Sequence, residues 1–208
     1  MNDTNKSNSR QRGRPRSFDW DEALDRAVLV FWDRGYEGAS INDLRQAMGI
    51  NPPSLYAAFG SKRNLFLAAI DRYAATLGSR PFGAFCLEPD ARKAVANLFE
   101  SSIRCATEKG KPRGCLIVSV ATVEATKDSD VRSKLADIFT RTDQAIAEHL
   151  QEAQKNNQTP AIADPKKMAN MVISVTHSIA TRARSGADPK ELSQLADNFI
   201  EVFFPRPA

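Results

Sequence analysis

The chain has 208 residues, 42% of them hydrophobic and 26% charged, as expected for a globular protein with one large core or a small domain joined to a larger one. No apolar run approaches the roughly 18–20 residues that cross a bilayer, and the polar first residues exclude a secretory signal, so we expect a cytoplasmic location. The net charge of +4 lies within residues 1–16, which hold five basic side chains and one acidic one and leave 24 of each sign elsewhere.

Residues 1–16 are therefore expected to form a flexible basic arm. Arms of this charge commonly bind polyanions such as nucleic acid, although a solubilising tail can have the same composition.

Two helices with clear start and stop signals are predicted after the arm. Asp19, followed three residues later by an acidic side chain, starts a helix that runs to about residue 34, before Gly35. Ser40 and Asp43 form a capping box for a second helix, which stops at Gly49.

Two further helices follow at once. Asn51 caps a short third helix with Pro52 at its first position, and Gly60 ends it. Ser61 caps a fourth helix, whose apolar face continues as far as Gly78.

The remaining chain forms a larger helical body. Residues 79–89 contain two prolines and a glycine and predict a linker. Beyond them apolar residues recur at helical spacing, and alternating strand patterns are almost absent. Helices are expected over residues 90–108, 115–127, 129–155, 164–185 and 188–204.

The most specific motif spans residues 40–65, SINDLRQAMGINPPSLYAAFGSKRNL, in which two short helices flank Met48-Gly49-Ile50 as in a helix-turn-helix. GINPPSLYAAFGSKRNL resembles the signature G-V-S-x-x-[ST]-L-Y-x-[HY]-F-x-[SN]-K-x-x-L of the TetR/AcrR family of transcriptional regulators. The preceding F-x-x-x-G-Y-x-x-A-S is similar to that family's F-x-x-x-G-[YF]-x-x-[TA]-[ST]. The resemblance covers about residues 17–66; the body adds only its helical content and RGCL, which is similar to one AcrR-like subgroup.

The resemblance implies an all-α homodimer and a function in regulation rather than catalysis. Residues 17–78 would be a helix-turn-helix DNA-binding domain, with three helices at its core, and residues 79–208 a helical domain for ligand binding and dimerisation. The expected function is sequence-specific binding to a palindromic operator on double-stranded DNA. The family commonly represses and is released by a small-molecule effector, and activation stays open.

The resemblance also implies DNA contacts. Ser40 and Tyr56 would bind phosphate oxygens, and Lys62 would pair with phosphate at a helix N-terminus. The alternative for Tyr56 is a core aromatic residue, and the alternative for Lys62 is an ordinary exposed lysine. Base reading is expected from Asn42, Pro52, Pro53 and Ser54.

The basic arm contains RGRPR, which resembles the Arg-Gly-Arg-Pro core that lies in narrow, A·T-rich minor grooves. We expect three arginines to enter such a groove: Arg12, Arg14 and Arg16.

Apolar positions in the body can line a ligand cavity or simply fill the core. The candidates for the cavity are Phe82, Phe85, Phe99, Ile103, Cys115, Val118, Thr122 and Phe139. The last two helices have more than one apolar face, as expected of helices buried between protomers. The candidates for this interface are Met171, Val175, Ile179, Leu195 and Phe199.

Other chemistry is weakly indicated. Cys105 and Cys115 flank a cationic loop that could activate a thiol, but inert buried cysteines are favoured. No metal or cofactor is expected. The rival classes are an enzyme on a helical body and an architectural DNA-bending protein, but no catalytic constellation supports the enzyme.

Overall fold

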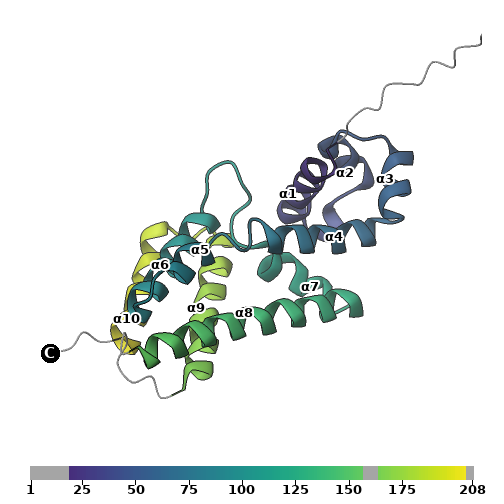
Figure 1. Cartoon of the computed structure of the whole chain (residues 1–208). Coiled ribbons are helices and arrows are strands. Elements are labelled where there is room, and N and C mark those ends of the chain that lie inside the picture. The colour runs from purple at the N-terminus through teal and green to yellow at the C-terminus, as the bar shows by residue number, and fades with distance from the viewer. Residues whose placement is uncertain (1–18, 157–163, 205–208) are drawn as a thin grey trace, which may run out of the picture.

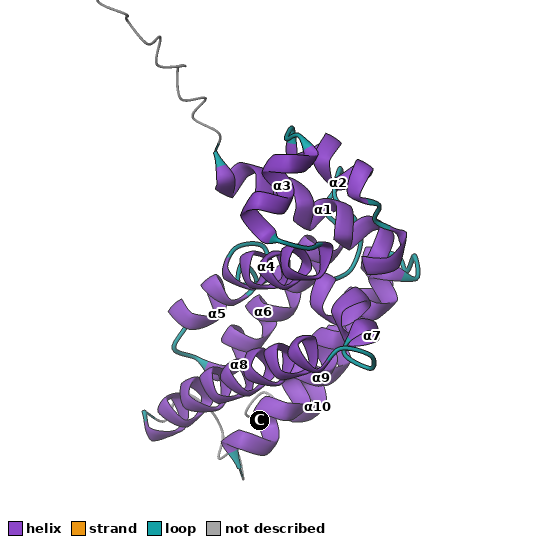
Figure 2. Ribbon diagram, turned by 90° about the vertical axis from the view of Figure 1, so that its right-hand side faces the viewer, coloured by secondary structure: helices purple, strands orange, loops and turns teal. Residues whose placement is uncertain are grey.

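The structure is a computed structural model that describes residues 19–156 and 164–204. All regular secondary structure in these ranges is helical, with no strand, which confirms the predicted all-α fold (Figures 1 and 2). The elements are α1 (Trp20–Gly38), α2 (Ile41–Met48), α3 (Pro52–Phe59), α4 (Lys62–Ala75), α5 (Phe82–Leu87), α6 (Ala91–Ala106), the π-helical turn η1 (Ile117–Ala121), α7 (Thr122–Glu124), α8 (Ser129–Lys155), α9 (Pro165–Arg184) and α10 (Pro189–Phe203).

Helices α1 to α4 form an N-terminal unit at one end of the molecule, and α5 to α10 form the body (Figure 1). The caps expected for the N-terminal unit are present, because Asp19, Ser40, Asn51 and Ser61 each accept a hydrogen bond from the first turn of their helix. Gly35 has φ 74° and interrupts the regular geometry of α1 at the position where the sequence predicts its end.

Two segments differ from the sequence prediction. Helix α4 ends at Ala75, three residues early, because the chain turns there, and a short helix, α5, occupies part of the predicted linker. The helix expected over residues 115–127 consists of η1 followed by the short α7. A π-helical turn makes i→i+5 hydrogen bonds. Such turns are rare, and those that occur are often found at functional sites.

The buried apolar side chains form two clusters. One contains side chains of α5, α6, α9, α10 and the second half of α8. The other joins α1 to α4 with η1 and the start of α8, where Val131 and Leu135 are buried. The N-terminal unit therefore shares a hydrophobic core with the body, so a shift of η1 or α8 acts on it directly.

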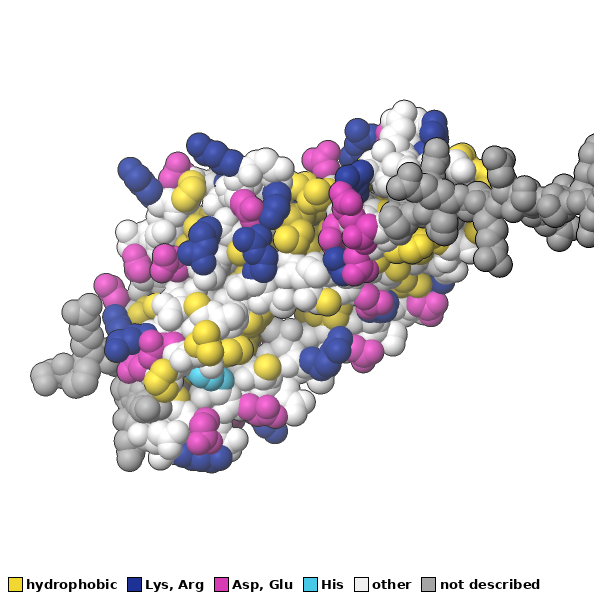
Figure 3. All heavy atoms as spheres, turned by 45° about the horizontal axis from the view of Figure 1, so that its top comes forward, with side chains coloured by type: hydrophobic (Ala, Val, Ile, Leu, Met, Phe, Trp, Pro, Cys, Tyr) yellow, Lys and Arg dark blue, Asp and Glu magenta, His cyan; other side chains and the backbone are white. Residues whose placement is uncertain are grey.

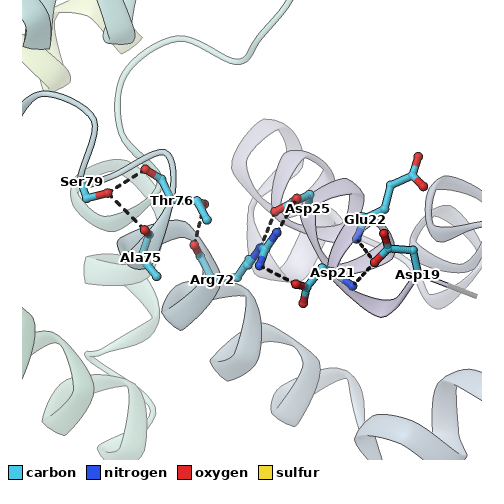
Figure 4. A network of polar contacts seen from close by, with 8 residues as sticks. All are labelled: Asp19, Asp21, Glu22, Asp25, Arg72, Ala75, Thr76 and Ser79. Atoms are coloured by element: carbon cyan, nitrogen blue, oxygen red, sulfur yellow. Dashed lines mark hydrogen bonds and ion pairs between the residues drawn. The ribbon is translucent and has the colours of Figure 1, made fainter. Parts of the chain in front are cut away.

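Ion pairs reinforce the packing around α4. Arg72 donates from Nε to Asp25 at 2.7 Å and approaches Asp21 at 3.3 Å, which fixes α4 against α1 (Figure 4). Lys134 of α8 pairs with Asp71 at 2.7 Å.

On the face drawn in Figure 3, basic and acidic side chains are interspersed, with hydrophobic patches between them. No helix in the described part of the chain is both long and apolar enough to span a membrane.

Candidate DNA-binding surface and effector cavity

The outer face of α3 is an exposed surface at the end of the N-terminal unit. Leu55 turns inward and is fully buried, whereas Pro52, Pro53 and Tyr56 are exposed, and Ser54 is half-buried. The Asn51 side chain accepts a hydrogen bond from the backbone N–H of Ser54 at 2.9 Å. Proline at the first helical position costs no hydrogen bond, since its missing N–H would have no partner in the helix. The exposed Tyr56 is therefore not the core aromatic of the alternative interpretation.

The start of α2 carries a polar cluster beside this surface. Ser40 donates a hydrogen bond from Oγ to the carboxylate of Asp43 at 2.6 Å. Asp43 also forms an ion pair with Arg34 at 2.7 Å. The hydrogen bond from Ser40, followed by that from Arg34, lowers the pKa of Asp43 to about 2. The side chain of Asn42 accepts from Arg45 Nε at 2.9 Å, so Arg45 is held along α2.

The first residue of α4 is positioned by an aromatic ring. Lys62 Nζ lies 4.5 Å from the ring centroid of Tyr36, a cation–π contact. The sequence did not indicate that Tyr36 contacts Lys62, because the two residues are on different helices. The predicted Arg12, Arg14 and Arg16 lie outside the described residues.

A cavity of about 210 Å³ lies in the body against the N-terminal unit. Its wall includes four of the predicted ligand contacts, Phe82, Cys115, Val118 and Phe139. Sequence reasoning missed most of the other wall residues, which come from elements far apart in the chain. These include Trp32, Tyr73, Leu77, Cys105, Ile138, Ile173, Thr176 and His177.

The remaining predicted contacts, Phe85, Phe99, Ile103 and Thr122, do not line this cavity. The ring of Phe85 lies tilted against that of His149, with centroids 4.5 Å apart, and Phe99 packs edge-on to Phe199, with centroids 5.5 Å apart. Phe85 and Phe99 both belong to the other hydrophobic cluster. Ile103 is buried in the same cluster. The hydroxyl of Thr122 donates to the Val118 carbonyl at 2.7 Å. Helical spacing identifies an inward position but cannot say whether a void or a neighbouring side chain lies there.

Both thiols at the cavity wall are held in the protonated form. Burial raises the pKa of Cys105 and of Cys115. The thiol of Cys115 also hydrogen-bonds with the hydroxyl of Tyr73, and burial raises the pKa of that phenol well above its usual value. Burial, which raises the pKa of both thiols, favours the inert alternative for these cysteines.

The residues predicted for the dimer interface separate into two groups. Ile179 is fully buried and Phe199 is 8% exposed, both within the core of a single protomer, so neither offers surface to a partner. Val175 and Leu195 are half-buried against that core, and Met171 is 39% exposed. The apolar faces of α9 and α10 thus turn mainly inward, toward α6 and α8.

The molecule therefore combines an all-helical body with a helix-turn-helix unit, which is the architecture of a helix-turn-helix transcriptional regulator. Residues 23–69 match the model for bacterial regulatory proteins of the tetR family, and residues 91–199 match the tetracyclin repressor-like C-terminal domain. The chain belongs to the TetR family and is a DNA-binding transcriptional regulator.

Individual relatives agree with this assignment. The HTH-type transcriptional repressor ComR of Escherichia coli strain K12 is 31% identical over 195 residues, which cover 93% of each chain. A cysteine mutant of the TetR family transcriptional regulator CifR, solved with 26-base-pair double-strand operator DNA, has 34% identity and a TM-score of 0.83, over 91% of this chain and all of that one. Reduced NemR of E. coli, with 17% identity and a TM-score of 0.79 over 90% of this chain and 97% of that one, is similar in fold. Membership of this family decides against an enzyme and against an architectural DNA-bending protein.

Proposed function

We propose that the protein is a homodimeric repressor that binds a palindromic operator and leaves it when a small molecule occupies the cavity. Residues 17–78 serve as its DNA-binding domain and residues 79–208 as its effector-binding and dimerisation domain. The repressors among its relatives, and the operator complex of CifR, support this proposal.

On DNA, the outer face of α3 enters the major groove. Pro52 and Pro53 cannot make bidentate hydrogen bonds but can pack on thymine methyl groups, so direct reading favours A·T pairs. Ser54 and Asn42 supply the polar contacts to bases. Tyr56 approaches the phosphate backbone.

Two further phosphate contacts frame the recognition helix. Lys62 reaches a phosphate from the N-terminus of α4, where the helix dipole adds favourable potential. Ser40 binds from the N-terminus of α2, and its hydroxyl turns away from Asp43 to do so. Arg12, Arg14 and Arg16 follow the adjacent minor groove.

The composition of the cavity wall is the observation that supports regulation by a small molecule. Trp32 of α1 and Tyr73 of α4 face it from the N-terminal unit, and Phe139 and His177 face it from the body. A ligand there contacts both parts at once, so its affinity depends on their relative position. That dependence is what couples ligand binding to DNA binding.

Dimerisation uses the outward face of α9 and α10. Met171 and Val202 are large apolar side chains that remain exposed on these helices, Val202 at 69%. Leu195 lies seven residues before Val202, about two turns along the same side of the helix, and is half-buried. With two-fold symmetry, the recognition helices would enter successive major grooves roughly 34–36 Å apart.

The test is to select bound fragments from a random DNA pool, footprint the best sequence, and then screen metabolites for its release. A palindrome with half-sites one helical turn or a multiple apart is expected, together with at least one releasing compound that no longer acts when Phe139 is replaced by tryptophan to fill the cavity. A non-palindromic footprint from a monomer would overturn the proposal.

A further inference from the structure

Trp32 lines the cavity, and its indole has a polar group in an unusual state. Trp32 is 2% exposed, and its Nε1–H has no hydrogen-bond partner within the described part of the chain. A buried donor without a partner loses its hydrogen bonds to water and gains nothing in exchange, at a cost of about 1–3 kcal/mol. Such groups are rare in folded proteins and require an explanation.

None of the neighbours of Trp32 within the described part of the chain accepts this hydrogen. Its ring packs edge-on to Tyr73, with the two ring centroids 5.2 Å apart. The hydroxyls of Thr142 and Thr176, elsewhere on the wall, donate to the backbone of their own helices. A molecule inside the cavity can supply the missing acceptor.

The other wall residues restrict the chemistry of that molecule. Phe139 and His177 lie 5.3 Å apart at their ring centroids, and burial lowers the pKa of His177, which is therefore neutral near pH 7. The charged residues on the wall are already paired, since Arg80 and Lys111 both contact Glu108, at 2.9 and 2.8 Å. A charged ligand would have to compete with these pairs, whereas an uncharged one meets apolar and aromatic surface.

The volume limits the size of the ligand. An engineered apolar cavity of about 150 Å³ binds benzene, so 210 Å³ admits one six-membered ring with a short substituent.

We propose that the effector is a small, uncharged, largely apolar molecule with a carbonyl-type acceptor oxygen, and that this oxygen accepts a hydrogen bond from Trp32 Nε1. This inference rests on the proposed effector function of the cavity. Because Trp32 belongs to α1, the hydrogen bond attaches the ligand to the N-terminal unit itself. Ligand recognition and the position of the DNA-binding helices are thereby joined at one residue.

Isosteric ligand pairs test this hydrogen bond. Acetophenone and α-methylstyrene have the same shape but differ in a carbonyl oxygen against a methylene, and cyclohexanone and methylenecyclohexane form a smaller pair of the same kind. The chain has two tryptophans, so ¹⁵N-labelled indole gives two N–H signals, and that of Trp32 is assigned from its loss in Trp32→Phe. We expect a ketone to move the Trp32 signal downfield and its hydrocarbon partner to leave it in place.

Affinities give the second readout. The preference for ketone over hydrocarbon should fall by about fivefold in Trp32→Phe, as expected for one hydrogen bond. Trp20→Phe is the matched control, since Trp20 is exposed and is not part of the cavity wall, and it should keep the preference.

The outcomes separate the two proposals. If ketone and hydrocarbon both perturb Phe139 and His177, with an unmoved Trp32 signal and a preference unchanged in Trp32→Phe, the acceptor inference is wrong and the effector cavity stands. If no member of either pair binds up to its solubility limit, the acceptor inference is overturned, and the metabolite screen on the selected operator still decides the proposed function.

Discussion

Arg63 of α4 and Asp128, the N-cap of α8, form a bidentate ion pair. Nε and Nη2 of Arg63 donate to the two carboxylate oxygens of Asp128 at 2.5 and 2.8 Å. Nη2 of Arg63 also donates to Asp130 at 2.6 Å. Asp128 caps α8 at the same time, by accepting from the backbone N–H of Asp130 at 2.9 Å. The residue before Arg63 is Lys62, a proposed phosphate contact. A displacement of α8 therefore reaches the DNA-binding surface through one residue.

The ion pair predicts a specific dependence of stability on pH. The hydrogen bonds from Arg63 lower the pKa of Asp128 to about 2, and the same pair raises the pKa of Arg63. Because the native carboxylate binds a proton less readily than the unfolded one, its stabilising effect is present above the ordinary pKa, near 4, and is lost as pH falls toward 2. Denaturant titrations between pH 5 and pH 2 should show this loss.

Asp128→Asn is the informative variant, because asparagine also caps helices but cannot form the ion pair. Asp43 has a pKa of about 2 as well, so wild type loses stability from both carboxylates in the same pH window. The slope of unfolding free energy against pH should be smaller in Asp128→Asn by up to about one bound proton. Identical slopes in the two proteins would show that the ion pair does not form in solution.

The contact between Arg63 and Asp128 also marks the limit of what could be predicted from the sequence. Caps and glycines located the helices of the N-terminal unit because those signals are local. The ion pair, the place of Trp32 at the cavity and the π-helical turn depend on residues far apart in the chain. The apolar stripe through Ile179 and Phe199 showed that this face is buried, but a stripe is the same whether the cover is a partner protomer or α6 and α8 of the same chain.

Lys62→Ala should weaken specific and non-specific DNA binding alike. Loss of one phosphate contact in each half-site should make the slope of log K against log salt shallower by roughly one unit per protomer. Binding isotherms between low and moderate salt measure this slope. Lys190→Ala on α10, at an exposed position far from α3, is the control and should leave it unchanged. A wild-type slope in Lys62→Ala would remove Lys62 from the interface.

Phe199→Ala should destabilise the protomer itself. Phe199 packs against Phe99 at 5.5 Å and Phe203 at 4.5 Å and is almost fully buried. Truncation of such a side chain typically costs about 3–5 kcal/mol of unfolding free energy. Urea denaturation measures the loss, and a change below about 1 kcal/mol would mean that Phe199 is not a core residue.

Val202→Glu should disrupt the dimer without unfolding the protomer. Val202 is 69% exposed, so the charge meets water in a monomer but would be buried against a partner. Sedimentation at micromolar concentration should give monomers with wild-type helicity and weak operator binding. Val123→Glu, at a residue 56% exposed on α7, is the matched control and should remain dimeric. A dimeric Val202→Glu protein would exclude this face of α10.

Deletion of residues 1–16 tests the arm, for which charge and motif agree. The segment carries all of the net positive charge, and Arg12, Arg14 and Arg16 immediately precede α1 in the sequence. Each arginine in a minor groove should contribute counterion release, and groove width should favour A·T-rich flanks without hydrogen bonds to bases. The truncated protein should bind the operator more weakly, with a flatter salt dependence and no preference between A·T-rich and G·C-rich flanks. Its helicity should match that of the full chain, because every described helix begins after the deletion. Full affinity with an unaltered flank preference would identify the arm as a solubilising tail.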